Sequence, residues 1–328
     1  MRKSGLTGIS LCIITILITA CSAQTGSSTL SLSHTEEEAM QSQPYLPTLQ
    51  EESEVRNGTS EDTLATPSDF PASYDYGSGR YTDWDYGDTH RRLPEPDGNQ
   101  TVLNTTPDPA GIQALYLWEE GNVPARTEIS QTMTGYFDEP DFRPYLTAIP
   151  VREGTEVKGA VVLLAGGAFQ VRGNYTDTLP TAAHLRELGY QTFIVDYRLR
   201  PYTQQEGALD VARAVRFIRK NAETYGIDPD DIAVMGYSAG GIQAGEFFLN
   251  FDEDILPTAL DPDYVPDELD AIPARASAAG MIYSFYGRLS VASMDEEALR
   301  AGNLPPTFYC YGTEDPFYDQ FEAQYALM

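Results

Sequence analysis

The second half of this chain contains short, continuously apolar segments that alternate with helical patterns, and this feature limits the possible folds more than any other. Four segments have the texture of strands buried on both faces, as a parallel sheet requires: 160–164, 192–195, 232–235 and 307–310. Apolar residues at spacings of three and four predict amphipathic helices over 178–188 and 208–225. The alternation predicts an α/β fold with a doubly wound, mostly parallel sheet and helices on both faces.

The flanking sequence predicts how this domain is bounded. Residues 145–151 alternate like an edge or hairpin strand, and residues 317–328 have the pattern of an amphipathic helix. Residues 22–107 are rich in Ser, Thr, Glu, Asp, Pro and Gly and show no sustained period, which predicts a disordered, acidic linker. We therefore expect a leader over 1–21, a linker over 22–107 and the α/β domain over 108–328.

The first residues predict export from the cytoplasm. Arg2 and Lys3 precede a short apolar run, 9–18, which has the layout of a signal peptide. The run ends in Ile-Thr-Ala-Cys, which resembles the bacterial lipoprotein box and implies a lipid on Cys21. An ordinary signal peptide with an incidental cysteine is the alternative. In both cases we expect an extracytoplasmic protein, and the lipid would anchor it to the cell membrane.

The composition excludes several classes of function. A formal net charge of -28, from 49 acidic and 21 basic residues, would repel nucleic acid. Cys12 lies in the leader and Cys21 carries the lipid, which leaves Cys310 as a single thiol that we expect to be buried in its strand and not catalytic. The sequence has no histidine and cysteine cluster, calcium loop or nucleotide-binding glycine loop, so we predict no metal and no cofactor.

The sharpest motif is Gly-Tyr-Ser-Ala-Gly over 236–240, directly after the strand 232–235 and directly before helical sequence. A strand, a tight turn and a helix form the context in which such a serine becomes a nucleophile. The glycines leave space around a serine that is held at a strained, positive φ. We therefore predict that Ser238 is the catalytic nucleophile at the start of a helix, whose dipole favours negative charge there.

A second motif, Gly-Gly-Ala-Phe over 166–169, follows the earlier buried strand 160–164. Acyl transfer creates an oxyanion, and preorganised backbone N–H groups that face it are among the largest contributions to catalysis. One donor would come from Gly167 or Ala168, and the other from Ala239, the residue after the nucleophile. The sequence thus predicts an oxyanion hole beside Ser238.

These runs, together with Asp-Tyr-Arg-Leu over 196–199, resemble the esterase and lipase branch of the α/β-hydrolase family from about Leu146 onward. In that branch the oxyanion loop commonly begins with histidine, where this chain has Ala165. The resemblance also implies an acid after a late strand, and Asp315 matches it. Asp315 would orient a histidine and stabilise its imidazolium form, with Glu314 as the substitute if the loop is shifted by one residue.

The sequence does not supply the expected base. In this fold the histidine follows the acid, and no histidine follows Asp315. His34 falls in the linker, His90 just before the domain, and His184 in a predicted helix where we expect a surface or partly buried residue. The resemblance implies a further strand, a histidine loop and a final helix beyond residue 328, so we expect the domain to be incomplete at its C-terminus.

A serine nucleophile with an oxyanion hole specifies acyl transfer, most often ester hydrolysis through an acyl-enzyme. The expected substrate is a small-molecule or polysaccharide ester, and the resemblance to bacterial esterases favours acyl groups on carbohydrate. Two alternatives remain open. The missing histidine favours a catalytically inactive, surface-anchored binding protein of the same fold, and an acyltransferase would use the same serine.

Overall fold

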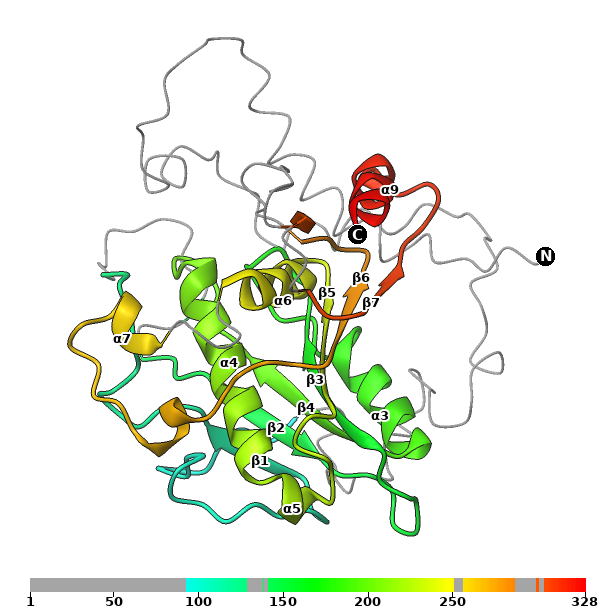
Figure 1. Cartoon of the computed structure of the whole chain (residues 1–328). Coiled ribbons are helices and arrows are strands. Elements are labelled where there is room, and N and C mark those ends of the chain that lie inside the picture. Colours follow the sequence, from blue (N-terminus) through cyan, green and yellow to red (C-terminus); the bar gives the residue numbers. More distant parts are fainter. Residues whose placement is uncertain (1–92, 129–137, 139–140, 251–255, 287–298, 301–303) are drawn as a thin grey trace, which may run out of the picture.

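The computed structural model describes residues 93–128, 138, 141–250, 256–286, 299–300 and 304–328 (Figure 1). Within these residues a seven-stranded sheet has the order β1-β2-β4-β3-β5-β6-β7. Its strands are β1 (Gln113–Tyr116), β2 (Tyr145–Ile149), β3 (Gly159–Leu164), β4 (Tyr190–Asp196), β5 (Ile232–Tyr237), β6 (Ala278–Ile282) and β7 (Thr307–Cys310). The leader, with the predicted lipid site at Cys21, and the linker up to residue 92 lie outside the described residues.

The sheet is mostly parallel. The strand β2 pairs antiparallel with both β1 and β4, whereas β4, β3, β5, β6 and β7 are all parallel to one another. The carboxyl ends of these five strands therefore lie at one edge of the sheet, where the loops that follow them come together. The predicted doubly wound α/β class is confirmed.

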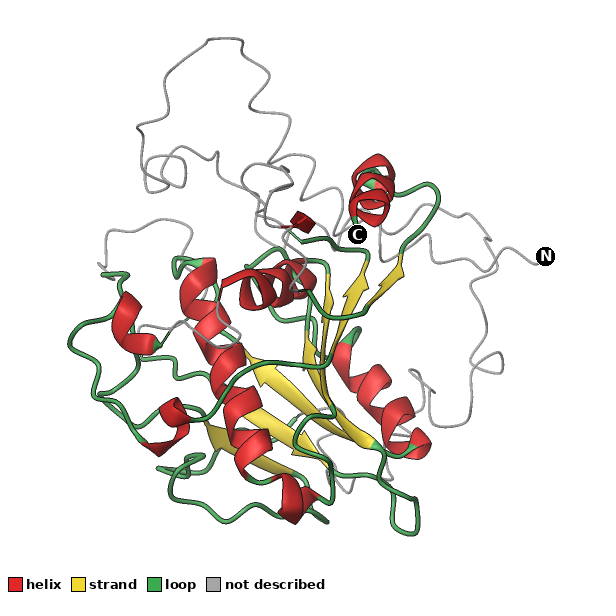
Figure 2. Ribbon diagram, in the orientation of Figure 1, coloured by secondary structure: helices red, strands yellow, loops and turns green. Residues whose placement is uncertain are grey.

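Helices cover both faces of the sheet (Figure 2). The helix α3 (Thr178–Leu188) lies on one face, and α4 (Gln204–Lys220) and α6 (Ala239–Asn250) lie together on the other (Figure 1). The other helices that lie wholly within the described residues are the short α5 (Ala222–Tyr225), α7 (Pro257–Leu260) and 3-10 helix η5 (Glu268–Ala271), and α9 (Tyr318–Leu327) after β7. The predicted helix 178–188 is confirmed at both ends.

Alternate residues of the central strand β3 enter two separate hydrophobic cores. Ala160, Val162 and Leu164 belong to the large core beneath α4 and α6, whereas Val161 and Leu163 pack with residues of α3. A strand whose successive side chains are buried on opposite faces must be apolar throughout. This is why the continuous apolar runs predicted the sheet.

The helix α4 begins four residues before its predicted start at residue 208. Thr203 caps it, accepting from the backbone N–H of Glu206, while the Glu206 carboxylate accepts from the N–H of Thr203. This reciprocal cap satisfies two backbone donors, so it extends the helix through the polar residues before the apolar stripe. At the other end, Gly226 takes a left-handed conformation after α5, at the stop that the sequence predicted.

Three parts of the chain differ from expectation. The strand β6 was not foreseen, and residues 145–151, predicted to form an edge or hairpin strand, contain β2, which is no edge strand because it pairs antiparallel on both sides. Residues of the predicted linker join the domain, because the buried Val102 donates its N–H to the carbonyl of Tyr116 in β1. The structure therefore places the start of the folded domain earlier than residue 108.

The expectation that Cys310 is buried is wrong. The strand β7 alternates between partly buried and exposed residues, and Cys310 and Phe308 lie on its exposed face, with 60% of Phe308 accessible to solvent. On the opposite face Tyr309 packs towards α9 through a hydrogen bond to Gln324. The apolar texture of 307–310 therefore reflects a half-buried strand at the end of the described sheet.

Candidate active site

The turn between β5 and α6 holds Ser238 in a strained conformation. Ser238 has φ of 47°, in the left-handed region, and its side chain is almost fully buried, with 3% of the residue exposed. A Cβ on Gly236 would lie 2.2 Å from the carbonyl oxygen of Gly240, so this position requires glycine. The sharp bend between a buried strand and a helix, on which the prediction for Ser238 depends, is present.

Hydrogen bonds fix the backbone of Ser238 from three directions. Its N–H donates to the carbonyl of Ile282 at the end of β6, at 3.0 Å. Its carbonyl accepts from the N–H of Ile242 in α6 at 3.1 Å and from the buried hydroxyl of Ser284 at 2.7 Å. Because β6 and the residues after it supply these partners, the unforeseen strand β6 helps to hold the predicted nucleophile in place.

The loop after β3 lies directly beside the nucleophile. A Cβ on Gly166 would contact the Cβ of Ser238 at 3.1 Å, and a Cβ on Gly240 would lie 2.2 Å from the carbonyl oxygen of Leu164. Gly167 and Ala168 both have positive φ, 134° and 55°. The loop therefore turns sharply against the start of α6, and only small residues allow this approach.

The amides predicted to form the oxyanion hole are available. Within the described residues, the N–H groups of Gly167, Ala168 and Ala239 donate no hydrogen bond to another protein group. Gly167 and Ala168 are on the loop beside Ser238, and Ala239 is the first residue of α6. Backbone donors left free next to a nucleophile can stabilise an oxyanion, and both Gly167 and Ala168 remain candidates for the first donor.

Two side chains that the sequence did not identify hold this loop. The buried Tyr197, after β4, donates its hydroxyl to the carbonyl of Ala165 at 2.7 Å and its ring meets that of Phe169 edge to face. Asp177, just before α3, accepts from the N–H of Gly166 at 2.8 Å. The resemblance gave Ala165 in place of an anchoring histidine, and these contacts show how the loop is anchored without one.

Asp315 lies in the turn between β7 and α9. It is mostly buried, with 9% exposed, whereas Glu314 is exposed, so the geometry favours Asp315 as the acid. Its Oδ1 accepts from the N–H of Phe317 at 2.9 Å, and its Oδ2 accepts no hydrogen bond from the described residues. Burial raises the pKa of Asp315 above its usual value, and the bond from Phe317 lowers it in part. An unsatisfied, partly desolvated carboxylate oxygen is suited to accept an imidazole N–H.

Comparison with known proteins gives consistent results. Residues 148–248 match the family model described as BD-FAE. Esterase LipQ of Mycobacterium tuberculosis is 28% identical over 137 residues, which cover 42% of this chain and 30% of that protein. An acetylxylan esterase of Xylanibacter ruminicola is 32% identical over 82 residues, covering 25% and 17% of the two chains. These matches support an α/β-hydrolase esterase family for this part of the chain.

Solved structures similar to this α/β-hydrolase domain include an acetyl ester-xyloside bifunctional hydrolase from Caldicellulosiruptor lactoaceticus. It is 20% identical, with a TM-score of 0.48 and coverage of 67% of this chain and 81% of the other. Esterase 2 of Thermogutta terrifontis, phosphorylated by paraoxon, is 19% identical with the same TM-score, covering 68% and 79%. The chain spans less than a third of the length of the two curated esterases described above.

Within the described residues, no histidine side chain forms a hydrogen bond with Asp315 or Ser238. His184 lies midway along α3 with an exposed side chain, as the sequence suggested, and neither Ser238 nor Asp315 contacts it. The other two histidines, His34 and His90, fall outside the part of the chain that the structure describes. The described site therefore contains the proposed nucleophile, acid and oxyanion donors without a base.

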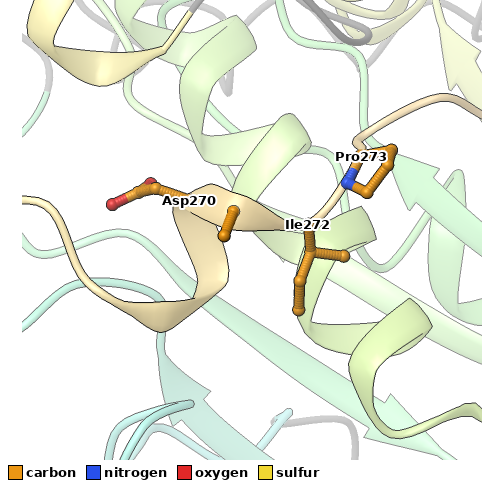
Figure 3. Close-up of a pocket in the computed structure, with 4 residues that line it drawn as sticks. Asp270, Ile272 and Pro273 are labelled. Carbon is orange, nitrogen blue, oxygen red and sulfur yellow. The ribbon is translucent and has the colours of Figure 1, made fainter.

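One surface pocket of the hydrolase domain lies away from this site. It has a volume of about 240 Å³ and is lined by Asp270, Ala271, Ile272 and Pro273 (Figure 3). These residues lie in and after η5 and precede β6, whose first residue pairs near the start of β5. The pocket is therefore at the opposite edge of the sheet from the carboxyl end of β5, where Ser238 lies.

The described residues lack two kinds of feature. They contain no group of three or more His, Cys, Asp or Glu side chains placed to hold a metal ion. Among the helices described, none combines the length and the apolar character that crossing a membrane requires.

Proposed function

We propose that this chain hydrolyses carboxylic esters through an acyl-enzyme formed on Ser238. The observation that carries the proposal is the geometry of the turn, in which a serine at positive φ lies beside a loop with free backbone amides. The curated relatives, which include an esterase and an acetylxylan esterase, support ester hydrolysis as the reaction.

In the proposed reaction the hydroxyl oxygen of Ser238 attacks the ester carbonyl while a base removes its proton. The carbonyl oxygen becomes an oxyanion, which accepts hydrogen bonds from the amide of Ala239 and from that of Gly167 or Ala168. Collapse of this intermediate expels the alcohol, which takes the proton from the base, and leaves the acyl group on Ser238. Water then attacks the acyl-enzyme by the same route and releases the acid.

The base in this proposal is an imidazole whose N–H donates to Oδ2 of Asp315. In this fold the histidine follows the acid in the chain. Asp315 would hold the ring in the correct tautomer and stabilise its protonated form. Ser238 without such a base would retain only the contributions of binding and of the oxyanion hole.

We propose acyl groups on carbohydrate as the substrate class. Support comes from two relatives, the acetylxylan esterase and an endo-1,4-beta-xylanase B of Butyrivibrio fibrisolvens that is 29% identical over 100 residues. We further propose that a lipid on Cys21 anchors the protein outside the cytoplasm, where polymeric carbohydrate is accessible. The basic and apolar leader before Cys21 supports this placement.

A fluorophosphonate probe tests the nucleophile directly, because it reacts with an activated serine and does not require deacylation. We expect the wild-type chain to be labelled and Ser238→Ala to remain unlabelled, with intact mass and peptide mapping locating the adduct. Equal labelling of the two proteins would remove Ser238 from the mechanism. If the wild type is labelled, acetate release from acetylated xylan, compared with release from a p-nitrophenyl ester, tests the substrate class.

The second candidate is a binding protein that keeps the fold without catalysis. The observation that favours it is the absence of an imidazole at Asp315 among the described residues. The same probe separates the two functions. A wild-type chain that folds, remains unlabelled and still binds xylan would support the binding protein.

A further inference from the structure

The carboxylate of Asp177 occupies an unusual position at the start of α3. Asp177 is the residue before the helix, where an aspartate ordinarily caps the first free N–H groups, yet its side chain makes no such bond. Its Oδ2 instead accepts from the N–H of Gly166 at 2.8 Å, and its Oδ1 accepts from the hydroxyl of Tyr283 at 3.1 Å. The side chain is thus turned away from its own helix and towards the loop after β3.

This carboxylate lies close to the nucleophile. A Cβ on Gly166 would contact Oδ2 of Asp177 at 3.0 Å and the Cβ of Ser238 at 3.1 Å. The Asp177 carboxylate and the Ser238 side chain therefore flank the same backbone position from two sides. Tyr283, the residue after β6, also contacts the Asp177 carboxylate through its hydroxyl, and its ring lies against that of Tyr237 in the nucleophile turn.

Asp177 is held by hydrogen bonds and not by an ion pair. It is buried, with 4% exposed, and no basic side chain of the described residues forms a salt bridge with it. Burial raises its pKa, and the bonds from Gly166, Tyr283 and Thr176 lower it in part. Burying an acid without a cation is unfavourable, and the hydrogen bonds from Gly166 and Tyr283 offset part of this cost.

We propose that Asp177 is a positioning residue that holds the oxyanion loop against Ser238, in place of the histidine that Ala165 replaces. By fixing the N–H of Gly166, it sets the direction of the peptide planes that follow. The free amides of Gly167 and Ala168 then face the space above Ser238. Tyr283 fixes the carboxylate from the other side, so that loop, carboxylate and nucleophile turn form one rigid unit.

The inference rests on the proposed function, because an oxyanion loop matters only if an oxyanion forms. Its test is the second-order rate of phosphonylation by a p-nitrophenyl phosphonate, whose P=O oxygen occupies the oxyanion hole as Ser238 attacks. We expect Asp177→Ala to lower this rate by about 10- to 100-fold, because small displacements of preorganised groups have effects of this size. The dissociation constant of the probe for the free enzyme should change little.

The conservative variants separate positioning from packing. In Asp177→Asn the amide oxygen can still accept from Gly166, so we expect it to recover most of the lost rate. Tyr283→Phe removes one restraint on the carboxylate, so its phosphonylation rate should lie between the rates of the wild type and of Asp177→Ala. Asn174→Ala is the matched control, since Asn174 is buried in the same loop and its side chain bonds to Asp196 and Thr178 but not to Gly166.

The outcomes distinguish this inference from the proposed function. No phosphonylation of the folded wild type would contradict the proposed function itself. If the wild type is labelled and Asp177→Ala is phosphonylated at the same rate, only the proposed role of Asp177 is overturned. Equal losses of rate in Asp177→Ala and Asn174→Ala, in step with their thermal stability, would show a structural role alone and also overturn it. If Asp177→Ala does not fold, Asp177→Asn and Tyr283→Phe carry the comparison.

Discussion

At the scale of single residues, the nucleophile turn depends on two glycines for which no larger residue has space. Gly236 faces the carbonyl of Gly240, and Gly240 in turn faces the carbonyl oxygens of Leu164 and Ala165 at the end of β3. These contacts are with backbone, which cannot rotate away as a side chain can. The two glycines therefore allow β3, β5 and α6 to meet at Ser238.

We expect Gly240→Ala to destabilise the domain by about 3 kcal/mol, because its Cβ would lie 2.2 Å and 2.5 Å from two carbonyl oxygens. Urea denaturation followed by circular dichroism measures this change. The control is Gly312→Ala in the turn after β7, where a Cβ would meet nothing within 4 Å. That variant should remain within about 0.5 kcal/mol of the wild type, and equal losses in both variants would contradict the close approach.

Residues of the site differ in how far the sequence could reveal them. The strained turn at Ser238 was predictable because it is specified by neighbours within two positions. Asp177 and Tyr283 were not, since they act through partners 11 and 106 residues apart in the chain. Only the fold brings such pairs together, and no local pattern marks an aspartate that binds a distant loop.

At the scale of elements, the carboxyl end of β4 carries a buried acid with few partners. The Oδ1 of Asp196 accepts from the side chain of Asn174 at 2.9 Å, Arg172 lies 3.9 Å away, and Oδ2 has no hydrogen-bond partner. Burial raises the pKa of Asp196 to about 6 from an ordinary 3.8, and Arg172 limits the rise. The folded state therefore binds this proton more tightly than the unfolded chain.

This shift makes a prediction with a definite sign. Between pH 4 and pH 7 the folded protein carries more of this proton than the unfolded chain, so the contribution of Asp196 to stability falls as the pH rises. Between pH 4 and pH 7 we expect the unfolding free energy of Asp196→Asn to rise, relative to that of the wild type, by at most about 3 kcal/mol, the equivalent of two pKa units. The measurement is the difference in unfolding free energy between the two proteins at each pH, which cancels the other titrating groups.

A difference that is constant with pH would contradict the shifted pKa. Asp228→Asn serves as the matched control, because it makes the same substitution at an exposed position in the turn before β5.

The elements themselves were predictable where burial was uniform. The strands β3, β4 and β5 are covered on both faces, so their apolar texture identified them. The strand β6 was missed because Ala278, Ala279 and Gly280 give little hydrophobic signal. Small residues are needed there, since a Cβ on Gly280 would lie 2.8 Å from the side chain of Met235 on β5. In β7, exposure of alternate residues could not be inferred, because the sequence does not show which face of a strand a helix covers.

At the scale of the whole molecule, the parallel strands bring distant segments to one edge of the sheet. The loops after β3, β5, β6 and β7 carry the oxyanion donors, Ser238, Tyr283 and Asp315 in turn. Neighbouring parallel strands end at the same edge, so order in the sheet determines which loops meet. The topology thus places the candidate acid and the candidate nucleophile on loops that follow β7 and β5, with β6 between these two strands.

The leader leads to a prediction for the whole chain. In a bacterial host with the lipoprotein pathway, we expect the wild type in the membrane fraction, and Cys21→Ser in a soluble extracytoplasmic fraction or retained as the uncleaved precursor. The physical reason is that acyl chains attached at residue 21 partition into the bilayer at about 0.8 kcal/mol per buried CH₂ group. Fractionation with immunoblotting and metabolic labelling with a fatty acid measure this, and Cys310→Ser is the control. Membrane association of a cleaved, mature Cys21→Ser protein without fatty-acid label would contradict the anchor.

The backbone conformation of Ser238 also bears on how such a chain evolves. A non-glycine residue with φ of 47° holds a conformation that costs about 1 to 2 kcal/mol, and glycine at 238 would relieve this while abolishing any nucleophile. Selection for a robust fold and selection for turnover therefore favour different residues at the same codon.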